Sequence, residues 1–298
     1  SGGTQTVARG SAVETTISNG GLLSALNNGT VISASVSSGG SLFLNNANAS
    51  NTIVYSGGRE IVGNLGREEN TTVNSAGILE VRSGGTATSV SQLSGGALIT
   101  NTGATISSGV ADVSTNFYVI NNIASSVVLN NSGVLTVQGI GSANATVIRS
   151  GGVEDVYGID TSATVSSQGL QNVLSGGTAT SASLVGGTQT ISGGSAISTT
   201  IYNAGVANIV SDGIASATTV NSGGIENISS GGLASGSLIN SGGSQNIFSS
   251  GVANSATLSG GIKNVSFGGT ANNTVISNGG DQIVNGGAIV TSADLLSG

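Results

Sequence analysis

The 298-residue sequence contains no cysteine, histidine, proline, methionine or tryptophan, and charged residues make up only 6% of it. Without imidazole and thiolate side chains, the common hydrolase triads, zinc sites and thiol redox pairs are excluded. The lack of cysteine leaves the redox compartment open. It is compatible with export, because a chain that crosses a pore unfolded gains nothing from disulfides that close early.

Basic residues and long apolar runs are also scarce. The chain has six Lys and Arg in all, widely scattered, and a net charge of −7, so we expect no face that binds nucleic acid. No run of roughly 18 apolar residues occurs, and the opening SGGTQTVARG has no basic segment followed by an apolar one. We therefore predict no membrane-spanning helix and no signal peptide, and interpret the chain as an internal, mature piece.

Glycine and small aliphatic residues dominate what is present. There are 51 Gly, and the hydrophobic 37% is mostly Ala, Val, Ile and Leu, with four Phe and four Tyr. Such a composition also fits disorder, but a disordered linker has no reason to return its apolar residues at a fixed spacing. Here they return in units of roughly 17 to 20 residues, which are Ile78–Gly96, Val134–Gly152, Leu170–Gly187, Thr188–Gly205, Val206–Gly224, Ile225–Gly243, Ser244–Gly261 and Ile262–Gly280.

Three apolar columns recur inside these units, close to the consensus x-Q-N-V-x-S-G-G-x-A-x-x-x-x-V-x-S-G-G. The first consists of Val81, Val137, Val156, Val173, Ile191, Ile209, Ile228, Ile247 and Val265. The second consists of Ala87, Ala143, Ala179, Ala196, Ala215, Ala234, Ala253 and Ala271. The third consists of Val73, Val147, Leu184, Ile201, Val220, Leu238, Leu258 and Val275. Each unit thus offers two or three short β segments separated by glycine turns, and no window carries a helical stripe.

A unit this short cannot bury its own apolar side, but stacking it on its neighbours can. The repeat therefore predicts an all-β fold, a β-solenoid of about 15 to 16 rungs of roughly 19 residues, which forms a single domain over residues 1–298. Parallel stacking places like residues on like, so repeated charges would repel, and proline would interrupt the ladder. The low content of charged residues and the absence of proline both agree with this fold.

The repeat resembles the passenger domains of AIDA-type self-associating autotransporters. The SGGTAT-like units carry the resemblance along the chain, and its more specific part is GGALITNTGATISSGVADVSTNFYVINNIASSVVLNNSGVLTV at Gly95–Val137. The resemblance implies a right-handed parallel β-helix that its own outer-membrane barrel exports to the surface of a Gram-negative cell. It further implies adhesion, autoaggregation and biofilm formation, and heptose added to serines in the cytoplasm by a dedicated heptosyltransferase. The barrel itself is absent from this sequence.

Serine recurs immediately before a glycine pair or its equivalent. One interpretation is structural, because the Ser hydroxyl bonds the local backbone in turns. The other is an exposed row of sugar acceptors, since a turn projects from the ladder whereas a strand serine such as Ser181 would face the core or a crowded surface. The candidates are Ser38, Ser56, Ser83, Ser94, Ser150, Ser175, Ser192, Ser222, Ser230, Ser241 and Ser259.

Asparagine recurs just before the first apolar column, at Asn172, Asn208, Asn227, Asn246 and Asn264. If the neighbouring Val or Ile points inward, alternation points these amides outward. Stacked amides can hydrogen-bond along the solenoid, which would make them a stabilising ladder. They could equally form a polar strip for association with a second copy.

The acidic residues Glu154, Asp155 and Asp160 suggest a glycosidase-like carboxylate pair. Such a pair needs a cleft and burial, which a convex solenoid with few aromatics does not offer, so we expect no catalytic site. The run Arg67–Glu69 is interpreted as a solvated loop with a local salt bridge. No phosphate-loop or calcium-binding nonapeptide motif occurs, and we expect no cofactor and no metal.

The leading hypothesis is a surface-displayed adhesin whose partners are other copies of itself, a heptosyltransferase and a host-cell receptor of unknown identity. Two alternatives remain. One is a polysaccharide-degrading enzyme on a β-helix scaffold, although such enzymes line a groove with acidic, basic and aromatic residues that are scarce here. The other is an inert stalk that holds a different adhesive tip away from the cell.

Overall fold

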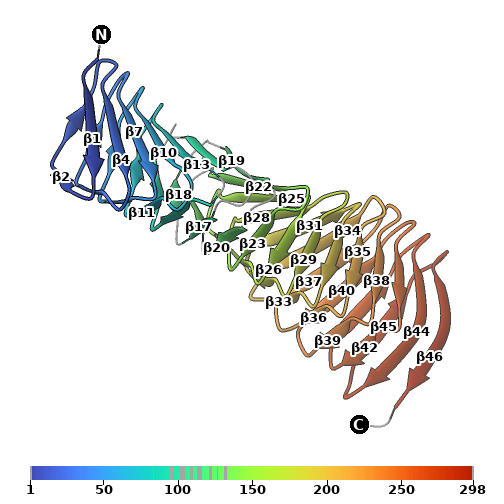
Figure 1. The fold of residues 1–298 in the computed structure, drawn as a ribbon. Helices are drawn as coiled ribbons and strands as arrows, with labels where there is room; N and C mark the ends of the chain where they lie inside the picture. Colours follow the sequence, from blue (N-terminus) through green and yellow to red (C-terminus); the bar gives the residue numbers. More distant parts are fainter. Residues whose placement is uncertain are drawn as a thin grey trace. The chain divides into compact units, whose positions relative to one another are not determined.

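The computed structural model describes residues 2–82, 84–93, 97–100, 105–107, 110–112, 116–120, 123–125, 127–130 and 133–296. The chain divides into two compact units, residues 1–146 and 147–298. Each unit is a parallel β-solenoid whose turns present three walls of strands (Figure 1). We call the wall of longer strands the first wall, and the two walls of shorter strands that follow it along the chain the second and third walls.

In the unit formed by residues 1–146, the first wall consists of β1 (Thr4–Ala8), β4 (Leu22–Leu26), β7 (Ser41–Asn45), β10 (Arg59–Val62), β13 (Ile78–Val81), β16 (Ala97–Thr100), β19 (Asn116–Ile120) and β22 (Val134–Gln138). The second wall consists of β2 (Ser11–Val13), β5 (Thr30–Ile32), β8 (Asn48–Ser50), β11 (Arg67–Glu69), β14 (Thr86–Thr88), β17 (Thr105–Ser107), β20 (Ile123–Ser125) and β23 (Ser142–Asn144). The third wall consists of β3 (Thr16–Ile17), β6 (Ser35–Val36), β9 (Ile53–Val54), β12 (Thr72–Val73), β15 (Ser91–Gln92), β18 (Val110–Asp112) and β21 (Val128–Asn130).

In the unit formed by residues 147–298, the first wall consists of β25 (Val153–Val156), β28 (Leu170–Val173), β31 (Thr188–Ser192), β34 (Val206–Val210), β37 (Ile225–Ile228), β40 (Ser244–Ile247), β43 (Ile262–Val265) and β45 (Asp281–Val284). The second wall consists of β26 (Ile159–Thr161), β29 (Thr178–Thr180), β32 (Ser195–Ile197), β35 (Ile214–Ser216), β38 (Leu233–Ser235) and β41 (Val252–Asn254). The third wall consists of β24 (Val147–Ile148), β27 (Thr164–Ser166), β30 (Ser183–Val185), β33 (Thr200–Tyr202), β36 (Thr219–Val220), β39 (Leu238–Asn240) and β42 (Thr257–Ser259). The longer β44 (Thr270–Ser277) and β46 (Ile289–Leu295) each run through both the second and the third wall.

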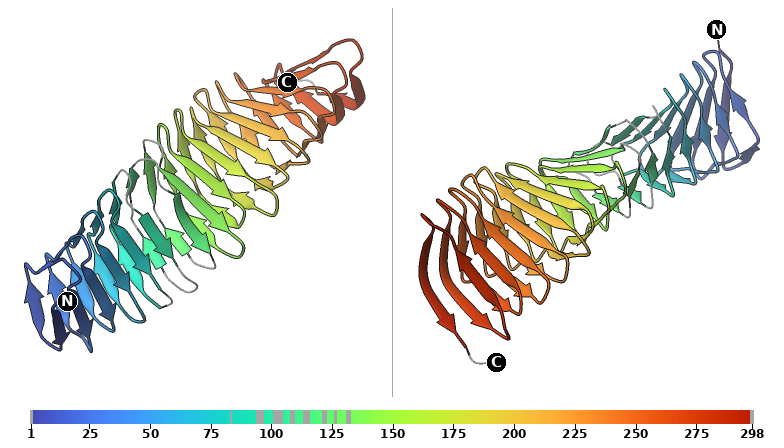
Figure 2. Two further views of the ribbon diagram at one scale, coloured as in Figure 1. Left: turned by 90° about the horizontal axis from the view of Figure 1, so that it is seen from above. Right: turned by 180° about the vertical axis from the view of Figure 1, so that it is seen from behind.

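Among the described residues, the strands of neighbouring rungs pair in parallel, and Figure 2 shows them stacked side by side within each unit. In the first wall, for example, Ile225 pairs with Val206 below and with Ser244 above, 19 residues away in each direction. The rung length varies slightly, since Val153 pairs with Leu170 after 17 residues. Among the described residues, the first walls of the two units together supply 16 strands, in agreement with the 15 to 16 rungs expected.

The predicted unit boundaries and core columns are largely confirmed. Each predicted unit begins where a first-wall strand begins, and the first two apolar columns are fully buried. The third column is wrong at three positions: the inward residues are Ile148 and Ile239, not Val147 and Leu238, and Ile276, not Val275, pairs with buried Leu258.

A single residue in the left-handed conformation turns the chain from the second wall to the third. Ser181, Ser198 and Ser255 hold this corner at φ of 57°, 57° and 54°. The N–H of Ser181 donates to the Ile197 carbonyl of the next rung at 2.8 Å, and Ser198 donates to Ser216 in the same way. The corner therefore continues the ladder, and Ser181 is an exposed corner residue rather than the strand residue expected.

Candidate functional site

The turn serines lie at two different corners of the solenoid. Of the candidates, Ser38, Ser56, Ser150, Ser222, Ser241 and Ser259 lie between the third wall and the first, whereas Ser175, Ser192 and Ser230 lie between the first wall and the second. Most are exposed turn residues, but Ser192 and Ser259 end strands β31 and β42 and are half-buried. Ser83 and Ser94 lie outside the described residues. The serines thus form two rows instead of the single row expected.

The glycines after each turn serine explain why the motif repeats. Gly242 has φ of +76°, a conformation that side chains with a Cβ rarely adopt. Gly243 is constrained differently, because a Cβ on it would lie 2.5 Å from the Val220 carbonyl oxygen of the rung below. The first glycine is needed for the turn and the second for close stacking, which leaves the serine before them exposed.

The corner between the second and third walls carries further exposed serines that the sequence analysis missed. They are Ser89, Ser162, Ser181, Ser198, Ser255 and Ser292, all exposed and at positive φ. Asn51, Asn70 and Asn273 hold the same corner in other rungs. A lone Ser or Asn between two short β-branched segments was the available signal, since Asn and Ser tolerate the left-handed region better than β-branched residues do.

The outward asparagines form a hydrogen-bonded ladder on the first wall. The amide nitrogen of Asn227 donates to Asn208 at 3.0 Å, Asn246 donates to Asn227 at 3.0 Å, and Asn264 donates to Asn246 at 2.8 Å. Asn172 instead donates to the Asp155 carboxylate at 2.8 Å, because Thr190 separates it from Asn208. All five asparagines are half-buried, and the predicted hydrogen-bonded ladder is present from Asn208 to Asn264; its contribution to stability stays a prediction. Their association with a second copy stays a prediction.

The inward neighbour of this ladder is a buried polar column. In the unit of residues 147–298 it consists of Glu154, Gln171, Gln189, Ala207, Glu226, Gln245, Lys263 and Gln282, in register from rung to rung. Glu154 through Lys263 are buried in the interior of the solenoid. In the repeat, the residue of this column stands just before the outward Asn, which precedes the inward Val or Ile. Because side chains alternate along a strand, this residue must point inward.

Glu154 and Asp160 share one amide donor. The Gln171 side-chain nitrogen donates to Glu154 Oε2 and to Asp160 Oδ2, each at 2.8 Å. Gln171 in turn accepts from Gln189 at 2.7 Å, and Thr199 donates to Gln189 at 3.0 Å. Burial raises the pKa of Asp160 to about 7. Glu154 and Asp160 are thus buried, contrary to the expectation, while Asp155 points outward and is half-buried.

The second cluster of this column contains the single lysine of the sequence. Gln245 donates to Glu226 at 2.6 Å and Ser237 donates to the same carboxylate at 3.3 Å. Lys263 is fully buried and donates to Thr274 at 2.9 Å. Burial raises the pKa of Glu226 and lowers the pKa of Lys263 to about 8, while the opposite charge of each partly offsets the effect on the other.

The unit of residues 1–146 has two carboxyl groups in the interior of one rung. Glu60 on β10 and Glu68 on β11 are 0% and 2% exposed. Burial, and next the neighbouring Glu68, raise the pKa of Glu60 well above its ordinary value, and burial also raises the pKa of Glu68. The run Arg67–Glu69 is therefore a strand with its central residue buried, not a solvated loop. Ion pairs in the described part of the chain join Glu80 to Arg59 and to Arg82.

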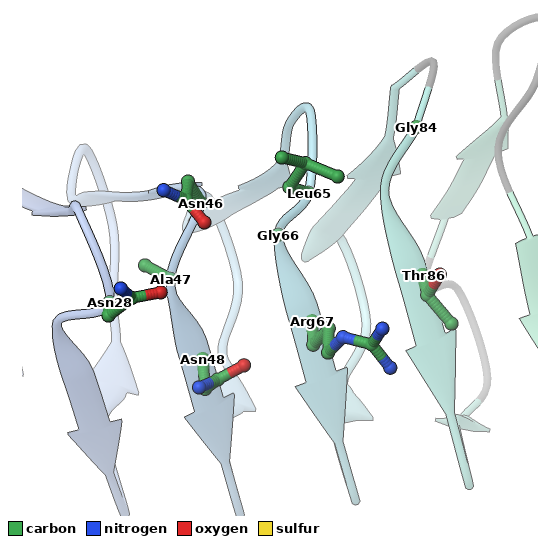
Figure 3. A pocket seen from close by; sticks show the side chains of 9 residues that line it. All are labelled: Asn28, Asn46, Ala47, Asn48, Leu65, Gly66, Arg67, Gly84 and Thr86. Atoms are coloured by element: carbon green, nitrogen blue, oxygen red, sulfur yellow. The ribbon is translucent and has the colours of Figure 1, made fainter.

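A shallow hollow of about 320 Å³ lies on the outer face of the same unit (Figure 3). Arg67 extends from β11 between Asn48 on β8 and Thr86 on β14, its register partners. Leu65 lies at the rim and is 62% exposed. The residues that line the hollow offer three side-chain amides, one hydroxyl and one guanidinium, and they include no pair of carboxylates for acid and base catalysis.

No group of three or more acidic, His or Cys side chains gathers in a metal-ligating arrangement within the described ranges. Over the same ranges, no helix has the length and hydrophobicity that a membrane crossing requires.

Comparison with known proteins places this site in a family context. Residues 108–169 match the family described as "Adhesin of bacterial autotransporter system, probable stalk". The chain is similar to the crystal structure of a TibC-catalysed, hyper-glycosylated TibA fragment, with 30% identity and a TM-score of 0.77, over 95% of this chain and 100% of that one. The tailspike protein gp208 of Dettilon matches at only 13% identity and a TM-score of 0.27, over 97% of this chain and 61% of that one. No curated protein sequence matches.

Proposed function

The chain belongs to the AIDA-type autotransporter adhesins, and from this premise we propose that it mediates autoaggregation, biofilm formation and host-cell adhesion, and that its serines accept heptose from a dedicated glycosyltransferase. As a passenger of this family it is displayed outside a Gram-negative cell. Glycosylation in the cytoplasm, before export, belongs to the same proposal.

The observation that supports the modification is the repeated exposure of serines at turns. Ser175, Ser222 and Ser241 each precede two glycines, and so have room around the hydroxyl without any opening of the strand ladder. The TibA fragment, which this chain matches over its full length, was glycosylated by TibC. One transferase could modify many rungs here because the same local geometry recurs.

Mass spectrometry tests this proposal. We expect the intact mass to increase by several heptose units when the chain is co-expressed with the transferase, and peptide mapping to place sugar on turn serines such as Ser175, Ser222 and Ser241. The corner serines Ser162, Ser181 and Ser198 belong in the same map. If sugar were found on these corner serines alone, the acceptors would be the corner serines and not the turn serines. An unchanged mass would refute the modification.

Self-association would use the outward asparagine column of the first wall, where many weak contacts add to a strong one. The test replaces Asn208, Asn227, Asn246 and Asn264 together by Lys, which sets four like charges in one column. The matched control places four Lys on the second wall at Ser216, Ser235, Asn254 and Asn272, which also stack in register. We expect only the first variant to lose cell aggregation; equal aggregation by both folded variants would exclude the asparagine face.

A second candidate function is a stalk that carries a different adhesive part, because the matching family is itself described as a probable stalk. Beads coated with the isolated chain separate the two functions. An adhesin predicts that the beads clump with one another and bind host cells, whereas a stalk predicts that they do neither.

A further inference from the structure

The rung that contains Glu60 and Glu68 interrupts two apolar columns. In the first wall, Glu60 pairs with Leu42 below and Leu79 above. In the second wall, Glu68 pairs with Ala49 below and Ala87 above. All four of these neighbours are buried, at 4% exposure or less. The two carboxyl groups therefore face each other in an interior that is otherwise aliphatic.

Two hydroxyl groups complete the same cluster. Thr71 precedes β12 in this rung, and Thr52 precedes β9 in the rung below, so the two are stacked at equivalent positions. Both are 0% exposed, and both lie close enough to influence the ionisation of Glu68. Together, Thr52, Glu60, Glu68 and Thr71 contribute six buried side-chain oxygen atoms that have no hydrogen-bond partner outside these four residues.

Comparison with Glu154 and Asp160 shows what this cluster lacks. That pair also lies between the first and second walls of one rung, but Gln171 on the adjacent rung donates an amide hydrogen to both carboxylates. The residues stacked on Glu60 are leucines, which donate nothing. Two buried carboxylates whose only donors are the two threonines are unfavourable, and a bound cation would compensate for them.

We infer that Thr52, Glu60, Glu68 and Thr71 form a buried calcium site in the unit of residues 1–146. Calcium takes six to eight oxygen ligands in flexible geometry, and two carboxylates that bind through both oxygens plus two hydroxyls supply six. The two negative charges match the divalent ion. Magnesium fits less well, because it keeps several waters and demands a strict octahedron, whereas this cluster is sealed from solvent. The inference goes beyond the proposed adhesive function and does not depend on it.

Because all four side chains are buried, the ion would enter while the rung folds, so binding and folding are coupled. The experiment therefore unfolds the whole chain in denaturant and refolds it with calcium chloride or with a calcium chelator. Equilibrium dialysis with radiolabelled calcium then measures the number of ions bound. We expect about one tightly held ion per chain, and a thermal midpoint higher on the order of 5 °C with calcium than with chelator.

Two variants identify the site. Glu60→Leu combined with Glu68→Ala restores the Leu and Ala columns of the neighbouring rungs, so it should fold, bind no calcium, and have the same midpoint with calcium and with chelator. The matched control is Glu14→Gln combined with Asp281→Asn, which removes two exposed carboxylates and should still bind one ion.

Three results would overturn the inference. The first is wild-type protein that refolds equally stably with and without calcium and retains no ion, which would indicate that protons satisfy the pair. The second is undiminished binding by the Leu/Ala variant, which would locate the ion elsewhere. The third is loss of binding in the exposed-carboxylate control. None of these results bears on adhesion or glycosylation.

Discussion

The two units differ at one position of the same fold. Among the buried residues that the structure describes in the unit of residues 1–146, the inward column of the first wall contains Leu23, Leu42, Leu79 and Leu135, interrupted by Glu60. In the unit of residues 147–298 the equivalent column consists mostly of Gln, Glu and Lys, joined by hydrogen bonds. The same backbone register therefore accommodates either a column of aliphatic side chains or a column of hydrogen-bonded polar side chains.

Glutamine makes the polar version possible because it can donate to one neighbour while it accepts from the other. Gln171 does both, since it donates to Glu154 and accepts from Gln189. In the unit of residues 147–298, an adjacent rung supplies an amide to each of the buried carboxylates Glu154, Asp160 and Glu226. The comparison teaches that the neighbouring rung determines whether a charge can be buried.

The largest expected effect comes from the removal of a shared donor. Gln171→Leu leaves the Glu154 and Asp160 carboxylates without their amide, and we expect the free energy of unfolding to fall by about 4 kcal/mol. Chemical denaturation followed by circular dichroism measures the change. The control, Thr188→Leu, adds an outward leucine above Leu170 on the same wall and should change stability by less than about 0.5 kcal/mol.

The next effect is a dependence on pH at Asp160. Its pKa is about 7 in the folded state and near 3.8 in the unfolded chain, so its stabilising contribution is complete below about pH 4 and is lost as the pH rises to 7. We expect the free energy of unfolding of Asp160→Asn, relative to that of the wild type, to increase by about 3 kcal/mol between pH 4 and pH 8. Thermal unfolding at several pH values tests this, and parallel curves for the two proteins would contradict it.

A smaller effect of opposite sign concerns Lys263. Its pKa falls from 10.5 in the unfolded chain to about 8, so stability present above pH 10.5 is lost as the pH falls through 8. Lys263→Gln places a glutamine next to Gln245 of the neighbouring rung and should raise the free energy of unfolding by about 2 kcal/mol at pH 7. The gain should shrink towards pH 10. Destabilisation at pH 7 would instead show that attraction to Glu226 outweighs burial.

The smallest expected effect is in the outward ladder. Asn227→Ala removes hydrogen bonds to Asn208 and from Asn246, and because the ladder is half-buried we expect a loss of about 1 kcal/mol. Ser244→Ala, a half-buried outward change on the neighbouring strand, is the control. Equal losses in the two variants would mean that the ladder bonds add nothing beyond those to water.

Periodicity was sufficient to predict the rungs, the two buried columns and the turns, because each follows from a spacing that repeats in the letters. The inward residue of the third wall was harder to predict. Leu238 and Ile239 are adjacent and equally apolar, and the left-handed corner before them sets which one points inward. Spacing alone does not reveal that corner.

The buried charges could be predicted only in part. Strict alternation along the first wall would have turned Gln171, Glu226 and Lys263 inward, but the usual exposure of charged residues argues the other way. Burial of Glu68 was harder to predict, because three consecutive charged residues, Arg67–Glu69, are typical of a segment exposed to solvent. Only its stacking between Ala49 and Ala87 shows that the middle residue faces the interior.

Because each rung pairs only with its neighbours in constant register, the solenoid also constrains how its gene can change. Loss of residues 225–243 would bring β34 against β40, with Asn208 meeting Asn246 and Ile209 meeting Ile247. Recombination between repeats could thus shorten or lengthen the protein in frame while it preserves both the core and the ladder. The same event would remove Glu226 and leave Lys263 buried without its counter-charge. The charged rungs therefore determine which recombinants remain stable.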